Sequence, residues 1–195
     1  MGRLTFMALA AVLAVLWGAA GPLAQERLFP NTKQRGRATV EYKDDTFQIV
    51  ASYDYSQRHH SSNWLLVDVA AWTKRRLILE RDNITLVTPS GSQTMVAAQR
   101  RFLMDSPRIS SLRQNAKVWR RELSIYLSPF APRESLKFFA LPGEGIIADT
   151  ALLDKDRVTA GEVYFEMPSG EWEAGTYALL IDHPYLRAAL PITLE

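Results

Sequence analysis

Basic side chains crowd one stretch of this sequence, and the chemistry they offer is the recognition of anions. Between Gln99 and Arg121, Asp105 is the only acidic residue in a run rich in arginine. A guanidinium group binds phosphate or carboxylate through two parallel hydrogen bonds, so the stretch predicts a site for lipid headgroups, polysaccharide or an acidic protein face. The alternative is a solvated helix face that pairs with acidic strands of the same chain. The candidate binding residues are Arg100, Arg101, Arg108, Arg113, Lys117, Arg120 and Arg121.

Residues suited to catalysis or metal binding are sparse. The chain has three histidines and no cysteine. His59 and His60 are adjacent, so their rings point to opposite sides of an extended segment, and His183 precedes a proline. Neither the spacing of zinc ligands nor a Gly-x-Ser-x-Gly elbow occurs. We therefore predict no catalytic residue, no metal ion and no cofactor. The alternative is an envelope hydrolase or a metal-dependent enzyme that uses scattered carboxylates and these histidines.

Two further side chains stand out by their surroundings. Asp68 is the only charge in an apolar strand, which predicts either a pairing with arginine or a raised pKa. Trp172 lies between Glu171 and Glu173 after a Pro-Ser-Gly turn, an exposed setting from which it could stack on a sugar or a partner. The alternative is that Trp172 packs over one end of the core, because tryptophan is usually largely buried.

Strands must position most of these residues. Residues 64–72 are apolar on both faces and predict a buried strand. Alternating patterns predict further strands at 38–42, 47–55, 163–167, 177–181 and 188–194, and Pro191 predicts an edge position for the last of these. We also expect strands within residues 119–127 and 136–141. Ser106-Pro107 predicts a helix start, and the spacing of Ile109, Leu112 and Ala116 extends that helix to Lys117.

The first residues predict export. An arginine, an apolar run and then small residues make Met1–Ala24 a signal peptide, with cleavage after Ala20 or Ala24, or retention as a membrane anchor, left open. The absence of cysteine excludes a lipid-linked N-terminus and disulfides. Residues 25–36 are expected to be a flexible N-terminal segment, and residues 37–195 a single domain. The protein is thus expected in the periplasm or outside the cell.

Two segments carry a family resemblance. Residues 63–91 follow the order of a hydrophobic strand, a polar turn, a short strand, a turn and a strand. Residues 173–179 have the spacing of the immunoglobulin Asp-x-Gly-x-Tyr-x-Cys segment, with Glu for Asp and Leu for Cys. In this pattern the chain resembles secreted bacterial immunoglobulin-like domains. The resemblance implies a β-sandwich in which the hydroxyl of Tyr177 bonds back to the backbone near the strand entry, and it implies no particular activity.

The sequence therefore predicts an all-β, immunoglobulin-like antiparallel β-sandwich with one short helix near residues 107–117. We expect an exported, non-enzymatic binding or assembly module whose partner is an unknown protein or an anionic envelope component. Contact with a membrane is expected only at its surface or through a retained signal anchor. Nucleic acid is not expected, because the formal net charge is only +2 and no recognition motif occurs. A further alternative is a structural or chaperone-like subunit that lends a sheet edge, for which the strand at 38–42 is a better template than the Pro191 strand.

Overall fold

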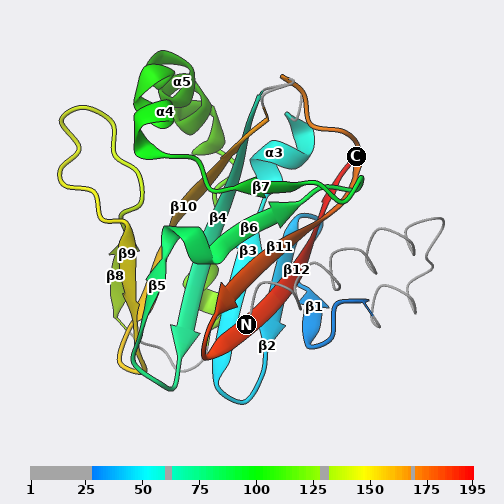
Figure 1. Ribbon diagram of the computed structural model, residues 1–195, viewed down its shortest axis with the longest axis vertical. Coiled ribbons are helices and arrows are strands. Elements are labelled where there is room, and N and C mark those ends of the chain that lie inside the picture. The colour runs from blue at the N-terminus through cyan, green and yellow to red at the C-terminus, as the bar shows by residue number, and fades with distance from the viewer. Residues whose placement is uncertain (1–27, 60–62, 128–131, 168–169) are drawn as a thin grey trace.

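The chain folds into two packed β-sheets with helices across one outer face (Figure 1). The computed structural model describes residues 28–59, 63–127, 132–167 and 170–195. The strands are β1 (Thr32–Gln34), β2 (Thr39–Lys43), β3 (Phe47–Ser52), β4 (Trp64–Thr73), β5 (Leu77–Glu80), β6 (Ile84–Val87), β7 (Gln93–Met95), β8 (Arg133–Leu136), β9 (Thr150–Leu153), β10 (Val158–Glu166), β11 (Gly175–His183) and β12 (Leu186–Leu194). The helices are α3 (Asp54–Arg58), α4 (Gln99–Met104) and α5 (Ser106–Ala116), with 3₁₀ turns η1 (Arg81–Asn83) and η2 (Leu123–Tyr126).

The larger sheet has the order β1-β2-β3-β4-β10-β8, and the smaller one β12-β11-β6-β7. Strands β5 and β9 form a separate two-stranded sheet. Apolar residues of the facing sheets make the main core. Among them Leu65, Val67, Tyr177 and Leu179 are each 0% exposed. Strand β4 is buried on its other face too, because helices cover it, and this explains its apolar sequence on both faces.

One pair of strands departs from the antiparallel prediction. Strand β8 runs parallel to β10, with Gly161 opposite Leu136. A Cβ atom on Gly161 would lie 2.6 Å from the carbonyl oxygen of Leu136, a distance that real Cβ atoms do not show. Glycine at this position therefore lets β8 approach β10. The strand predicted at 136–141 is wrong in its position, because the observed strand β8 covers Arg133–Leu136 and ends where the predicted strand begins.

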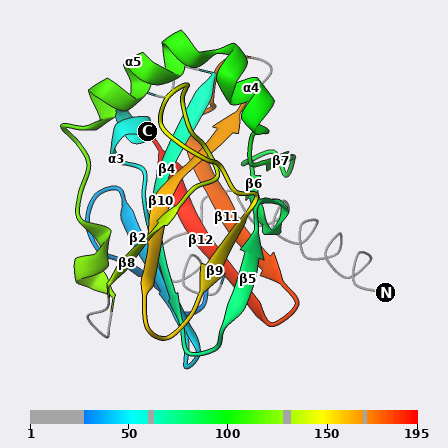
Figure 2. The same ribbon diagram turned by 90° about the vertical axis from the view of Figure 1, so that its left-hand side faces the viewer.

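The described part contains three α-helices, where the sequence predicted one. The predicted helix near 107–117 is confirmed as α5, with Pro107 in its first turn. Helix α4 precedes it, and both helices lie over the outer face of the larger sheet (Figure 2). Phe102 and Ile109 share a buried cluster there with Trp64. The predicted strand within 119–127 is wrong. The chain there forms η2, whose Leu123 packs on the same sheet face beside Val50.

The N-terminal segment belongs to the folded domain from residue 28 onward. Phe29 is buried against Val87 and Leu180 of the smaller sheet, and β1 pairs with β2. The described residues of the 25–36 segment thus include a strand and a buried side chain, and the flexibility of this segment stays a prediction. Strand β2 holds Val40 between β1 and β3, so the 38–42 strand is not the free edge expected of it. The predicted signal peptide, 1–24, lies outside the described residues, and none of the described helices is long and apolar enough to cross a membrane.

Two other predictions are confirmed. Strand β12, which contains Pro191, is the edge of the smaller sheet, where the missing N–H of proline is tolerated. At the start of β11 the hydroxyl of Tyr177 donates to the carbonyl oxygen of Glu173 at 2.7 Å. This is the bond back to the strand entry that the resemblance at residues 173–179 implies.

Candidate functional site

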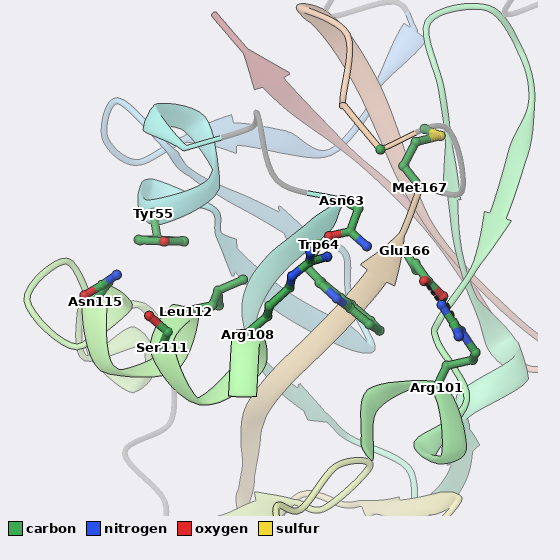
Figure 3. Close-up of a pocket in the computed structure, with 11 residues that line it drawn as sticks. Tyr55, Asn63, Trp64, Arg101, Arg108, Ser111, Leu112, Asn115, Glu166 and Met167 are labelled. Atoms are coloured by element: carbon green, nitrogen blue, oxygen red, sulfur yellow. Dashed lines mark hydrogen bonds and ion pairs between the residues drawn. The ribbon is translucent and has the colours of Figure 1, made fainter. Parts of the chain in front are cut away.

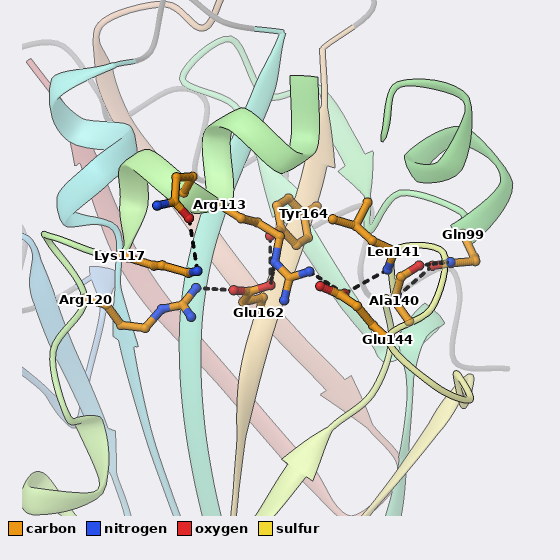
Figure 4. A network of polar contacts seen from close by, with 10 residues as sticks. Gln99, Arg113, Lys117, Arg120, Ala140, Leu141, Glu144, Glu162 and Tyr164 are labelled. Carbon is orange, nitrogen blue, oxygen red and sulfur yellow. Dashed lines mark hydrogen bonds and ion pairs between the residues drawn. The ribbon is translucent and has the colours of Figure 1, made fainter. Parts of the chain in front are cut away.

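A network of ion pairs joins helix α5 and the segment after it to the larger sheet (Figure 4). Arg113 on α5 places Nη1 2.5 Å from Oε2 of Glu144 and Nε 3.0 Å from Oε2 of Glu162. Arg120 pairs with Glu162 as well, and its Nε lies 3.3 Å from Oδ1 of Asp68. The arginines therefore bind carboxylates supplied by β4, β10 and the loop that contains Glu144.

Sheet register explains why arginines gather here. Asp68 and Glu162 stand opposite each other on β4 and β10. Two like charges in directly opposed positions destabilise a sheet. Arg120 contacts both carboxylates and so compensates their repulsion. The hydroxyl of Tyr164 donates to Oε2 of Glu162 at 2.8 Å, and burial raises the pKa of this tyrosine far above its ordinary value.

For Asp68 the sequence predicted a pairing with arginine or a raised pKa, and the structure has both. Asp68 pairs with Arg120, and its pKa is raised to about 6. Burial is the main cause of this rise, the nearby carboxylates of Glu162 and Asp54 add to it, and Arg120 opposes it. One side of the network opens into a cleft of about 460 Å³ that Asp68, Arg120 and Glu162 help to line.

The other predicted basic residues do not converge on one patch. Arg101 makes a two-pronged contact with Glu166, with Nε 3.0 Å from Oε2. Arg121 pairs with Asp54 at 3.1 Å, and Lys117 bonds the side chain of Gln114. Arg100 is exposed. Much of the basic run thus pairs with acidic residues of the same chain, as the alternative interpretation stated.

Arg100 has no ion pair with a described residue and Arg108 has only a long one; of the two, Arg108 lies in a groove. Its nearest carboxylate is Asp105, at a long 3.8 Å, and 73% of its side chain is exposed. Asp105 is already engaged, because it accepts a 2.7 Å hydrogen bond from the indole N–H of Trp64. The guanidinium of Arg108 therefore keeps most of its donors free for a ligand.

The groove has a volume of about 820 Å³ and runs between α5, α3 and the ends of β4 and β10 (Figure 3). Leu112 and Met167 give it an apolar lining. Its polar lining comes from Asn63, Ser111 and Asn115, and the paired Arg101 and Glu166 close one end. At the other end stands the ring of Tyr55, one face of which stacks on His59 with ring centres 4.5 Å apart. This arrangement can hold an extended chain that carries an anionic group.

The two histidines that the structure describes, His59 and His183, lie at the ends of different elements. The Nδ1 atom of His59 lies 3.0 Å from the carbonyl oxygen of Tyr55. His183 is buried at the end of β11, and His60 lies outside the described residues. Among the residues that the structure places, no group of three or more His, Asp or Glu side chains could hold a metal ion.

Trp172 is buried, with only 2% of its surface exposed, and its ring packs edge-on against Tyr177. It is therefore a core residue, and the surface position needed for stacking on a sugar or partner is not found. The tryptophan instead covers the interior beside the Tyr177 hydroxyl contact, in agreement with the alternative prediction.

Sequence reasoning missed most of the groove. Tyr55, Asn63, Ser111 and Asn115 come from three separate elements or their flanks, and no local spacing links them. Only Arg108 and Arg101 were named as candidates, on the strength of their charge. No protein-family model, curated protein or solved structure matches this chain.

Proposed function

We propose that the chain is an exported, immunoglobulin-like, non-enzymatic binding module whose partner is an anionic chain held in the groove beside α5. The observation that carries this proposal is the guanidinium of Arg108, exposed and held only by a long 3.8 Å contact with Asp105, in a groove where Arg101 and Glu166 pair closely with each other. The Tyr177 contact and the two-sheet core support the immunoglobulin-like assignment. The signal-like sequence of Met1–Ala24 supports export.

The ligand would place a carboxylate or phosphate on Arg108. Ser111 and Asn115, at helical spacing from Arg108 on the same side of α5, would supply a hydroxyl and an amide to neighbouring polar groups. Tyr55 would offer the face that His59 leaves open. An acidic protein segment or an acidic envelope polysaccharide has this chemistry.

The test is affinity isolation of the tagged, exported protein from its native envelope at low and high salt. Arg108→Glu reverses the groove charge, and Arg100→Glu makes the same charge change at an exposed site outside the groove lining. We expect a salt-sensitive acidic partner that Arg108→Glu loses and Arg100→Glu retains. Equal retention by both variants, or recovery of a monomer without a partner, would contradict the groove proposal.

One arrangement favours the hydrolase alternative. Asp68, with its pKa raised to about 6, lies opposite the carboxylate of Glu162 beside a cleft, and a carboxyl group with a raised pKa can act as a general acid or base. Arg120, however, binds both groups, which suits a structural role better. Hydrolysis of a peptide, ester or glycoside that disappears in a folded Asp68→Asn variant would establish the enzyme instead.

A further inference from the structure

The turn between β4 and β5 carries three consecutive basic residues, Lys74, Arg75 and Arg76. All three side chains are exposed, and none has an ion pair with any residue that the structure describes. Most of the basic run at 100–121, in contrast, is neutralised by carboxylates of the chain itself. Unpaired positive charge is therefore concentrated at this turn, which the sequence alone presents only as a polar connection.

Hydrogen bonds hold the turn in place. The backbone N–H of Lys74 donates to the carbonyl oxygen of Thr46 at 2.8 Å, and the hydroxyl of Thr73 donates to the same oxygen at 3.1 Å. The N–H of Arg75 in turn donates to the hydroxyl of Thr73 at 3.3 Å. The backbone of the β4–β5 turn is thus held against the β2–β3 turn by hydrogen bonds, and this fixes the position from which the basic side chains extend.

An exposed aromatic ring stands beside these cations. Tyr185, on the turn between β11 and β12, is 79% exposed. Together with Arg75, Arg76, Leu77 and Leu186 it lines a small hollow of about 230 Å³. The combination places a tyrosine ring, apolar carbon and two guanidinium groups at one end of the sandwich.

Acidic residues nearby do not cancel the charge. The β2–β3 turn contributes Asp44 and Asp45, together with Lys43. Asp44 accepts hydrogen bonds from the backbone N–H groups of Thr46 and Phe47, so its oxygens serve that turn. Arg187 of β12 pairs with Asp182 of β11 and adds no net charge. The β9–β10 turn, whose Lys155 carbonyl oxygen accepts a hydrogen bond from the indole N–H of Trp72, carries Asp154 and Asp156 but also Lys155 and Arg157, and Arg157 pairs with Asp154. That turn adds no net charge, so the three basic residues at 74–76 and Lys43 outweigh Asp44 and Asp45.

We propose that this end of the molecule, the cationic tip formed by Lys74, Arg75, Arg76 and Tyr185, binds the surface of an anionic phospholipid membrane. Basic residues are attracted to anionic headgroups, and arginine contacts their phosphates with two hydrogen bonds. Tyrosine favours the headgroup level, where its ring is in apolar contact and its hydroxyl is wet. The exposed Tyr185 favours lipid over a soluble polyanion, because a bilayer surface offers both environments and a soluble polyanion offers no apolar one.

The position of the tip agrees with a role distinct from that of the groove. In Figure 1 the β4–β5 and β11–β12 turns lie at the lower end of the sandwich, while α4 and α5 lie at the upper end. A protein bound to a membrane through the tip would hold the groove beside α5 away from the lipid. The tip proposal therefore does not depend on the groove having a ligand.

Co-flotation with vesicles tests the proposal, using the exported protein as recovered from cells. Vesicles of phosphatidylcholine alone are compared with vesicles of phosphatidylcholine and phosphatidylglycerol, at low and high salt. The test variant reverses the tip (Lys74→Glu, Arg75→Glu, Arg76→Glu). The control makes the same charge change at exposed residues outside the tip (Arg100→Glu, Lys117→Glu, Lys137→Glu). A third variant, Tyr185→Ser, removes the ring.

We expect salt-sensitive binding to the anionic vesicles that weakens by about tenfold or more in the tip variant and persists in the control. Tyr185→Ser should weaken binding without removing its salt dependence. Equal flotation of the tip and control variants would overturn the proposal, as would no preference of the wild type for anionic vesicles. Retention on an immobilised acidic polysaccharide without vesicle binding would overturn the lipid assignment. Thermal unfolding of each variant shows that a loss of binding is not a loss of fold.

Discussion

Asp68 and Glu162 face each other across β4 and β10, and one arginine, Arg120, pairs with both. This relationship makes a like-charged pair of strand residues tolerable on a mostly covered sheet face. It also gives the sheet a pH-sensitive position, because burial holds the pKa of Asp68 at about 6, above its ordinary value of 3.8.

The first prediction concerns the pH dependence of stability. A carboxyl whose pKa is higher in the folded state binds its proton more tightly there, so its contribution to the free energy of unfolding falls as pH rises from about 4 to about 6. Asp68→Asn removes this contribution. The stability of the variant relative to wild type should therefore rise across that interval, by on the order of 2 kcal/mol.

Urea unfolding at several pH values measures the difference. NMR titration of the Asp68 carboxyl carbon should have its midpoint near pH 6. The control is Glu134→Gln, at an exposed carboxylate on β8. Its free energy of unfolding relative to wild type should stay constant between about pH 4 and about pH 6. A constant difference between Asp68→Asn and wild type across the interval would contradict the raised pKa.

The second prediction is that Arg120→Ala destabilises the protein by about 2 kcal/mol, because Asp68 and Glu162 are left facing each other with less compensation. Arg113 still pairs with Glu162, and Arg120 is partly exposed, so the cost is smaller than for a fully buried pair. Arg100→Ala should change stability by less than about 0.5 kcal/mol.

A double-mutant cycle identifies the cause. If the loss arises from Asp68, Arg120→Ala should cost less in an Asp68→Asn background than in wild type. Additive effects of the two changes would show that Arg120 acts through packing and not through this carboxylate.

Regular strands were predictable from sequence because their signal is local. The two apolar faces of β4, the alternation in β10 and the Glu-x-Gly-x-Tyr spacing before β11 each depend on neighbouring residues. Pro191 marked an edge strand for a similarly local reason, since proline has no N–H to donate.

Helix α4 and turn η2 were not predictable in this way. Ala98 precedes α4 without a side-chain cap, and the alternating residues before it suggest a strand. What holds α4 is the packing of Phe102 on Trp64 and Tyr164, residues far away in the chain. Leu123 of η2 and Leu127 just after it suit either a strand face or a helical turn, and contact with Val50 and Ala70 favours the turn.

For the candidate site, the sequence predicted where basic residues are dense but not which of them stay unpaired in the fold. Charge density identified the run from Arg100 to Arg121, but whether a charge is free depends on which carboxylates the fold brings to it. Arg101 meets Glu166 of β10, whereas Arg108 has no close partner. The segment Lys74–Arg76 has fewer basic residues than the run from Arg100 to Arg121. Among the described residues, however, no carboxylate lies within ion-pair distance of its three side chains.

The third prediction concerns Gly161. A Cβ at this position would lie 2.6 Å from the carbonyl oxygen and 2.7 Å from the Cβ of Leu136, so Gly161→Ala must push β8 away from β10. We expect a loss of about 2 kcal/mol, and faster amide exchange in β8 than in β3. Gly36→Ala is the matched control, because the nearest atom to its added Cβ is 3.9 Å away. Unchanged exchange in β8 would show that the parallel pairing survives the substitution.

The fourth prediction tests the Tyr177 contact. Tyr177→Phe removes the hydroxyl that donates to the carbonyl oxygen of Glu173 and keeps the ring against Trp172, so it should lower the free energy of unfolding by about 1 kcal/mol. Burial raises the pKa of Tyr177 to about 12, so the loss should be the same at any pH from neutral to about 10. Tyr185→Phe, at an exposed tyrosine on the next turn, should change stability by less than about 0.5 kcal/mol. If denaturant unfolding gives equal values for the two variants, the Tyr177 hydroxyl does not stabilise the strand entry, and the support it lends to an immunoglobulin-like assignment is lost.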